Sequence, residues 1–341
     1  MIECIFTLDY EIYGDGRGDL QSLVHEPAER LRQLFLRRGV RFVTFVEVAE
    51  LERIEEAGSD AAIDAVNAQV RDLHGEGFET ALHIHPQWYD AVFEHGHWQL
   101  DYAEYNLCTL PRPRVVELVD RALSHLRRLV GQPSFTPLAF RAGNWLFQPT
   151  ATAAEVLAER GIRIDSSVFK GGVQRRHGLD YRPASANADF WRFTDDVNVP
   201  DPAGSMIELP IHTRMVPFWK MVTSKRVGLR NAGAMAAGSG KGRFERLRDF
   251  ARLRYPLKLD FCRMTLAEMT SSVEATLRED RHRPGTVRPV VAIGHTKDPI
   301  DIEALDRFLS YLASRGVTVS TFASLYPRLW PGSGQAVPGD A

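Results

Sequence analysis

The sequence has few cysteines, almost no net charge and no long apolar run. Its three cysteines, Cys4, Cys108 and Cys262, are far apart and show no metal-binding or redox spacing, which predicts reduced thiols and a cytoplasmic protein. A formal net charge of −2 predicts no general affinity for nucleic acid or for a membrane surface. No apolar run has membrane-spanning length, so we expect no transmembrane segment. The short apolar run at the start has no basic residue before it and ends at Asp9, unlike a secretory signal.

The composition that remains is that of a globular chain with a large core. Of the 341 residues, 44% are hydrophobic and 25% are charged, and the length suits an α/β barrel with insertions. The expected strands are residues 2–9, 40–46, 79–85, 136–142, 162–166, 206–212, 287–295 and 317–322. The expected helical stretches are 27–38, 47–75, 114–130, 150–160 and 301–315. Strands separated by helices predict a parallel sheet, and seven or eight such units predict a (β/α) barrel.

We expect a single domain over residues 1–328, with insertions at about 170–205 and 214–260. The tail 331–341 is rich in Gly and Pro and is expected to be disordered. The section 214–258 contains many Lys and Arg residues and few acids. Two interpretations of this section remain open: a solvated helix face, or a basic lid that attracts phosphate or another anion on a substrate.

The first expected strand ends in two carboxylates, Asp9 and Glu11. Side chains alternate between the faces of a strand, so these two acids point the same way. They are candidates for a metal site or a general base, although carboxylates also end ordinary strands. The third expected strand ends in His83 and His85, which by the same alternation share one face, as two metal ligands require. A histidine packed in the core is the alternative for either of them.

Three other expected strands end in Arg141, Asp165 and His295. Each residue alone is compatible with capping or packing. A guanidinium after an apolar run is costly to bury without a carboxylate partner. Functional groups of a parallel barrel lie at the carboxyl ends of its strands, so five strand ends with such residues predict one shared site.

The order of these motifs resembles that of the polysaccharide deacetylases, also called the NodB-homology or carbohydrate esterase family 4 group. The resemblance spans roughly residues 1–325. Each motif is weak alone, whereas the ordered set is fairly specific. The resemblance implies a distorted (β/α) barrel with seven strands. The matching pieces are Thr7-Leu8-Asp9-Tyr10-Glu11, Glu79-Thr80-Ala81-Leu82-His83, Phe140-Arg141-Ala142-Gly143, residues 161–167 and Ile293-Gly294-His295.

The resemblance also implies catalytic roles. Asp9 corresponds to the catalytic base, and His295 corresponds to the general acid. Arg141 corresponds to the arginine that orients the base, and Asp165 to the acid that pairs with this arginine.

A divalent metal, zinc in our expectation, follows from the same resemblance. Glu11 corresponds to the metal-binding acid, which is normally Asp, and His83 to the first metal-binding histidine. The family places its second histidine four residues after the first, where this chain has Gln87. His85 is the expected replacement, because it lies on the same face as His83.

The function implied is removal of an N-acyl group, N-acetyl in our expectation, from a sugar. Residues 82–86 and 294–297 resemble a bacterial subgroup found among surface-polysaccharide and lipopolysaccharide O-antigen genes. The expected substrate is a sugar, or a nucleotide- or lipid-linked sugar, with an anionic group among the possibilities. Candidate substrate-binding residues are Trp88, Asn144, Trp145, Lys297 and Asp298. Core packing is the alternative for each tryptophan, and surface pairing is the alternative for Lys297 and Asp298.

Three other functions remain open. The first is deformylation or deacetylation of a sugar on a lipid-phosphate carrier, suggested by the basic section 214–258. The second is an inactive barrel that binds carbohydrate, suggested by Gln87. The third is hydrolysis of a C–N bond in a compound that is not a sugar.

Overall fold

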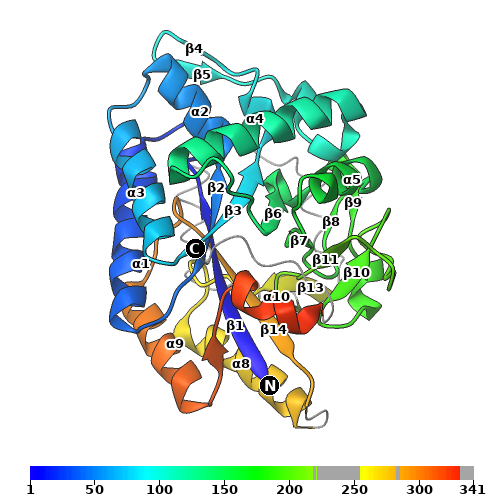
Figure 1. The fold of residues 1–341 in the computed structure, drawn as a ribbon. Coiled ribbons are helices and arrows are strands. Elements are labelled where there is room, and N and C mark those ends of the chain that lie inside the picture. The colour runs from blue at the N-terminus through cyan, green and yellow to red at the C-terminus, as the bar shows by residue number, and fades with distance from the viewer. Residues whose placement is uncertain (218–219, 221–253, 282–284, 331–341) are drawn as a thin grey trace.

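A curled, mostly parallel sheet forms the centre of the molecule (Figure 1). The computed structural model describes residues 1–217, 220, 254–281 and 285–330. The strands of the sheet are β1 (Ile2–Tyr10), β2 (Val43–Glu47), β3 (Glu79–Ile84), β6 (Ala139–Ala142), β7 (Ile164–Asp165), β10 (Trp191–Phe193), β11 (Met206–Glu208), β14 (Arg288–His295) and β15 (Thr318–Val319). Their order is β10-β11-β7-β6-β3-β2-β1-β14, and β15 also pairs with β1. Only the β10–β11 pair within this described sheet is antiparallel.

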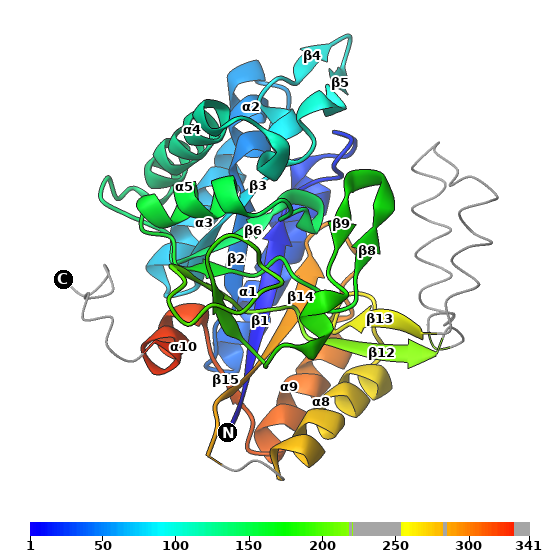
Figure 2. The ribbon, with the colours of Figure 1, turned by 90° about the vertical axis from the view of Figure 1, so that its right-hand side faces the viewer.

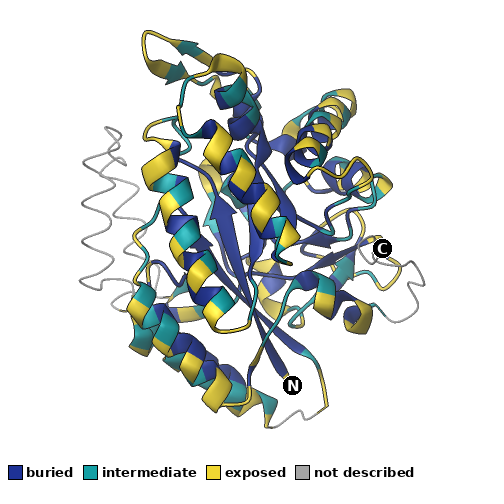
Figure 3. Cartoon of the chain, turned by 60° about the vertical axis from the view of Figure 1, so that its left-hand side comes forward, coloured by how far each residue is buried: buried dark blue, intermediate teal, exposed yellow. Residues whose placement is uncertain are grey.

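Helices cover the outer face of the sheet and turn their exposed residues away from it (Figure 3). They are α1 (Glu26–Arg37), α2 (Val48–Ala57), α3 (Ile63–Gly75), α4 (Arg112–Val130), α5 (Ala151–Glu159), α8 (Leu266–Asp280) and α9 (Ile302–Ser314). A further helix, α10 (Phe322–Leu329), packs against the inner face instead. Helix α1 shows why the helices on the outer face pack there. Its residues Leu31, Leu34 and Phe35 recur at helical spacing and are buried, and Phe35 contacts Phe6 of β1 with 5.3 Å between ring centres. No described helix is long and apolar enough to span a membrane.

Short hairpins and turns surround the carboxyl ends of the strands. The hairpins are β4 (Val92–Glu94) with β5 (His97–Gln99), β8 (Val173–Gln174) with β9 (Leu179–Asp180), and β12 (Thr213–Pro217) with β13 (Arg254–Lys258). Figure 2 shows β12 and β13 beside β14. One-turn helices lie at Gln21–His25, Pro86–Trp88, Tyr102–Glu104, Leu107–Thr109, Gly143–Trp145, Arg175–His177 and Pro183–Ala186.

Alternate strand residues fill the inside of the curl. One end of this interior is apolar, with residues such as Ile5, Phe45 and Val291, and the helix α10 closes it. The same alternation continues along each strand toward its carboxyl end. At that end the inward positions are polar, and they form the site described below.

The predicted α/β class is confirmed, whereas a continuous ring of strands is not formed by the described residues. The two sides of the curl meet through single parallel bridges from Ile211 to Phe169 and to Val291. The strand expected over 317–322 is only the short β15. Helix α10 follows it, because Thr321 and Ser324 form a capping box there.

The sections expected as insertions are partly strands. β10, within 170–205, extends the sheet, and β12 and β13 are the described ends of the section 214–260. The rest of the basic section and the tail 331–341 lie outside the described residues.

Candidate active site and metal centre

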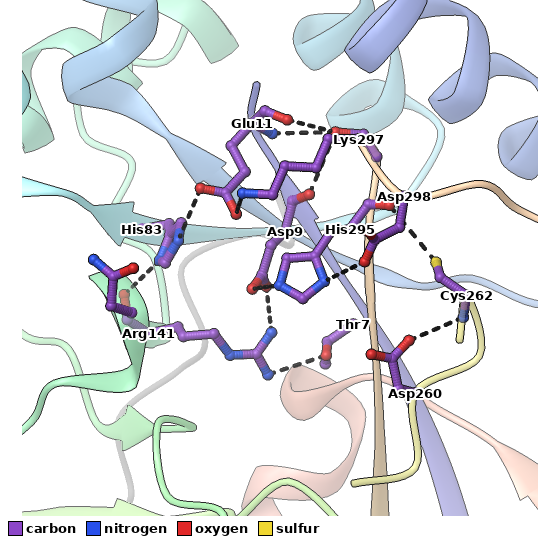
Figure 4. A network of polar contacts seen from close by, with 12 residues as sticks. Thr7, Asp9, Glu11, His83, Arg141, Asp260, Cys262, His295, Lys297 and Asp298 are labelled. Atoms are coloured by element: carbon purple, nitrogen blue, oxygen red, sulfur yellow. Dashed lines mark hydrogen bonds and ion pairs between the residues drawn. The ribbon is translucent and has the colours of Figure 1, made fainter. Parts of the chain in front are cut away.

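The carboxyl ends of four strands bring the predicted chemical residues to one place (Figure 4). β1 and β14 run in parallel with Asp9 beside His295, and β3 and β6 run in parallel with His83 beside Arg141. All four residues and Glu11 are buried. The tertiary structure therefore gathers residues that range from position 9 to position 295 of the chain.

Asp9 lies between two cations. One of its oxygens accepts a short hydrogen bond from Arg141, and the other lies 3.3 Å from Nε2 of His295. Burial favours the neutral acid, but the guanidinium of Arg141 and then His295 outweigh it and hold the pKa of Asp9 well below its usual range. Asp9 is therefore ionised at neutral pH.

Arg141 is fixed by four further groups. Its guanidinium donates to Oγ1 of Thr7 at 3.0 Å, to Oγ of Ser166 at 3.2 Å and to the carbonyl oxygen of Ser166 at 2.8 Å. It also lies 4.1 Å from the ring centre of Phe45. These contacts account for its guanidinium nitrogens, so Asp9 is held in one orientation.

The expected ion pair between Arg141 and Asp165 is not formed in the described structure. Asp165 instead accepts hydrogen bonds from the hydroxyl and the N–H of Ser167, at 2.7 and 3.1 Å. The reason is strand register, because Asp165 of β7 pairs with Phe140 and not with Arg141. Its side chain therefore points to the outer face of the sheet. There Glu208 is its neighbour on β11, and burial and Asp165 hold the pKa of Glu208 well above its usual range.

His295 is held between two carboxylates. Its Nε2 faces Asp9, and its Nδ1 lies 3.5 Å from Asp298. Burial alone would lower its pKa, but Asp298 and Asp9 raise the pKa of His295 to about 9. Arg263 donates to both oxygens of Asp298, at 2.8 and 3.1 Å, and fixes that carboxylate. His295 is therefore a cation at neutral pH.

Glu11, His83 and His85 form a cluster with ligand atoms within 4.8 Å of one another. Oε2 of Glu11 lies 3.1 Å from Nε2 of His85 and 3.8 Å from Nε2 of His83. This oxygen is buried and has no hydrogen-bond donor among the described residues. One carboxylate oxygen and two imidazole nitrogens with such an orphaned oxygen fit a divalent metal ion.

The outer nitrogens of both imidazoles have partners. Nδ1 of His83 donates to the carbonyl oxygen of Arg141 at 2.7 Å, which leaves Nε2 for a ligand bond. Nδ1 of His85 contacts the side-chain amides of Asn144 and Gln87, at 3.2 and 3.3 Å. When either amide turns its oxygen to Nδ1, Nε2 of His85 is also free to bind a metal.

The candidate substrate residues separate into different places. Trp88 is fully buried against Trp98, so it is a core residue and does not face a substrate. Lys297 donates to Oε1 of Glu11 at 2.7 Å and so lies beside the cluster of Glu11, His83 and His85. Asn144 contacts Nδ1 of His85, and Asp298 lies beside Nδ1 of His295. Trp145 is partly exposed, as are Asn144, Lys297 and Asp298, and its ring centre lies 5.9 Å from that of His295.

The sequence analysis missed Glu47. It ends β2 in register with His83 and is fully buried, and one of its oxygens accepts from the first N–H groups of α2. Its other oxygen has no partner among the described residues, and burial raises its pKa. The strand-end rule would have found it, but the expected strand stopped one residue earlier.

Asp260 was missed as well. Its carboxylate lies close to His295 and Asp298, within 4.8 Å for one ligand atom of each residue. A single bridge from Asp260 to Ile293 places it beside β14. Its sequence context carries no signal, because it lies outside the predicted strands.

No family model matches this chain, and no curated protein matches it. Solved structures do match. A probable polysaccharide deacetylase from Pseudomonas aeruginosa PAO1 superposes with a TM-score of 0.52 and 14% identity, covering 97% of this chain and 92% of that one. A GH57 branching enzyme from Thermococcus kodakaraensis superposes with a TM-score of 0.51 and 13% identity, covering 98% and 72%.

The fold is shared with these carbohydrate-active proteins. The likeness extends over nearly the whole chain in both comparisons, so it includes the strands that carry the cluster. At such low identity it shows the fold alone, and the chemistry is argued from the site.

Proposed function

We propose that this protein is a metal-dependent amidohydrolase that removes an N-acyl group from a sugar. The acyl group that we propose is acetyl. The observation that carries the proposal is the division of the two inward carboxylates of β1. Asp9 is bound by Arg141 and His295, whereas Glu11 faces His83 and His85. One carboxylate is thus available for a proton and the other for a metal, as metal-assisted hydrolysis of an amide requires. The fold shared with a probable polysaccharide deacetylase supports a sugar substrate.

Glu11, His83 and His85 would hold the divalent ion, zinc in our proposal. When bound, such an ion polarises an acyl carbonyl and acidifies water. The chain supplies the neighbouring groups: Lys297 neutralises part of the charge of Glu11, and the carbonyl of Arg141 orients His83.

Asp9 is the general base in this mechanism. It is ionised because Arg141 and His295 stabilise its charge, and Arg141 aims it toward the reacting water. Proton transfer by a positioned base contributes about 10²–10⁴-fold to a rate.

His295 is the general acid and protonates the departing amine. Its pKa of about 9 keeps the imidazole charged at neutral pH, so the proton is present before the C–N bond breaks. Asp298 holds the ring from the opposite nitrogen. Asp165 acts indirectly. Its hydrogen bond with Ser167 orders the turn in which Ser166 binds Arg141.

The proposal is tested by acetate release from N-acetylated sugars. Protein loaded with zinc should release acetate, treatment with a chelator should stop the reaction, and added zinc should restore it. Absence of bound metal, with no binding on titration, would instead favour a barrel that binds carbohydrate without catalysis, the alternative that Gln87 suggests.

We place the reaction in the synthesis of bacterial surface polysaccharide or lipopolysaccharide O-antigen. This placement rests on the resemblance of residues 82–86 and 294–297 to that subgroup. Deletion of the gene should leave one additional acyl group per repeat of the surface polysaccharide, measurable by mass spectrometry. An unchanged polysaccharide would refute the placement without touching the chemistry.

A further inference from the structure

Lys258 has no ion pair with any residue that the structure describes, although the charge of Asp260 acts on it. The chain has only six lysines, and Lys258 is the last residue of β13. Its ammonium lies 3.0 Å from the ring centre of Trp145 and 4.8 Å from that of Phe169. It forms neither a hydrogen bond nor an ion pair with any residue of the described ranges. By contrast, Lys297 binds Glu11, and Lys170 donates to the carbonyl oxygens of Asn187 and Ala188.

Lys258 lies next to the reacting groups. Trp145, which it covers, is the neighbour of His295. Two residues after Lys258, Asp260 forms a bridge to Ile293 of β14. The nearby guanidinium groups are already engaged, Arg141 by Asp9 and Arg263 by Asp298. Among the described residues near this end of the sheet, Lys258 is therefore a basic group whose hydrogen-bond donors are left for another molecule.

The support of Trp145 is rigid. Asn144 and Trp145 both have left-handed backbone angles, with φ of 56° and 61°. Residues other than glycine rarely adopt this conformation, and those that do are often found at functional sites. The carbonyl oxygen of Trp145 accepts a hydrogen bond of 2.7 Å from the hydroxyl of Tyr181, which fixes the turn. A fixed indole with one face toward a cation gives a flat, partly exposed surface beside His295.

We propose that Lys258 and Trp145 form an anion subsite, so that the sugar acted on carries a carboxylate or a phosphate beside the acylated position. This inference rests on the proposed function and narrows its substrate class. Lys258 determines specificity by binding the anion, and it does not touch the bond that is broken. Burial lowers the pKa of Lys258 to about 7, and a bound anion offsets that cost of burying the charge.

The test is equilibrium binding of three probes to the whole protein: glucose, glucose 1-phosphate and glucuronate. Wild-type protein should bind one or both anionic probes about tenfold or more tightly than glucose, measured by calorimetry. Lys258→Met should lose this preference, and Lys258→Arg, which keeps the charge, should retain most of it. Preference for the phosphate identifies a phosphorylated sugar, and preference for glucuronate identifies a sugar acid.

Lys170→Met is the matched control. Lys170 is also partly buried beside a tryptophan, with its ammonium 5.4 Å from the ring centre of Trp191, but two of its three N–H donors already bind carbonyl oxygens. This variant should bind all three probes as wild type does. Equal binding of glucose and both anions by wild type, or an unchanged preference in Lys258→Met, would overturn the subsite.

Kinetics separates the subsite from the activity. For an anionic N-acetyl sugar, Lys258→Met should raise KM about tenfold and leave kcat unchanged, and for a neutral one it should change neither. Binding of the anion through Lys258 without acetate release from any sugar would leave the subsite and refute the activity. Equal acetate release from neutral and anionic sugars by wild type and Lys258→Met would refute the subsite and leave the activity.

Discussion

The main-chain carbonyl oxygen of Arg141 accepts a hydrogen bond of 2.7 Å from Nδ1 of His83. The side chain of the same arginine donates to Asp9. One residue therefore orients a metal-ligand candidate with its backbone and the proposed base with its guanidinium. Movement of β6 would disturb both groups together, which couples the geometry of the metal centre to that of the base.

Asp9→Asn should separate metal binding from turnover. The amide cannot accept the proton of water, so acetate release should fall by about 10²–10⁴-fold or more. Zinc content, measured by atomic emission, should stay as in wild type because the proposed ligands are Glu11, His83 and His85, whereas Asp9 belongs to a second group with Glu11 and His295. Asp15→Asn, in a loop near the start of the chain, is the control. Full activity of Asp9→Asn would refute its role as the base.

His83→Ala should lose both metal and activity. The substitution removes one nitrogen ligand and also the hydrogen bond to Arg141. His85→Ala should behave in the same way. The measurement is zinc content after dialysis together with acetate release. Retention of stoichiometric zinc by either variant would exclude that histidine as a ligand.

Gln87→Leu should weaken metal binding without removing a ligand. Gln87 contacts Nδ1 of His85, and loss of such a partner usually costs about 10–100-fold in metal affinity. Competition with a zinc chelator gives the affinity, and thermal unfolding checks that the fold is kept. An affinity equal to that of wild type would mean that Asn144 alone orients His85.

The activity should decrease as the pH rises through about 9, because His295 then loses the proton that it donates. Asp298→Asn removes one of the two carboxylates that raise the pKa of His295, so it should move this midpoint to lower pH. The folded pKa of His295 lies above the ordinary value of 6.5. Its contribution to stability is therefore complete below about 6.5 and is lost as the pH rises through about 9. A midpoint unmoved by Asp298→Asn would contradict the assignment.

Trp88→Ala should mainly affect stability, whereas Trp145→Ala should mainly affect sugar binding. Trp88 is fully buried, so its truncation should cost about 3–5 kcal/mol of unfolding free energy and leave metal affinity unchanged. Trp145 is partly exposed, so its truncation should cost less stability and weaken sugar binding. Urea unfolding and calorimetry measure the two effects. A stable Trp88→Ala protein that binds sugar poorly would reverse this assignment.

Local patterns in the sequence were enough to show which residues could share a face. Asp9 with Glu11, and His83 with His85, stand two residues apart, and the alternation of side chains in a strand is a local property. The alternation of strands and helices likewise predicted a parallel sheet, whose carboxyl ends meet at one edge. These two facts were enough to predict the cluster of Glu11, His83 and His85 and the closeness of Asp9, Arg141 and His295.

The partners across strands depend on the tertiary fold. Asp165 was expected on Arg141, but a register with Phe140 turns it to the other face, and Ser166 takes its place. A shift of one residue in register exchanges inside for outside, and no local pattern reveals it. The contact of Lys297 with Glu11 and that of Lys258 with Trp145 also join residues far apart in the sequence. No local pattern predicts where such long side chains end. Strand ends can be predicted from local periodicity, whereas the contacts between them are set by how the strands align.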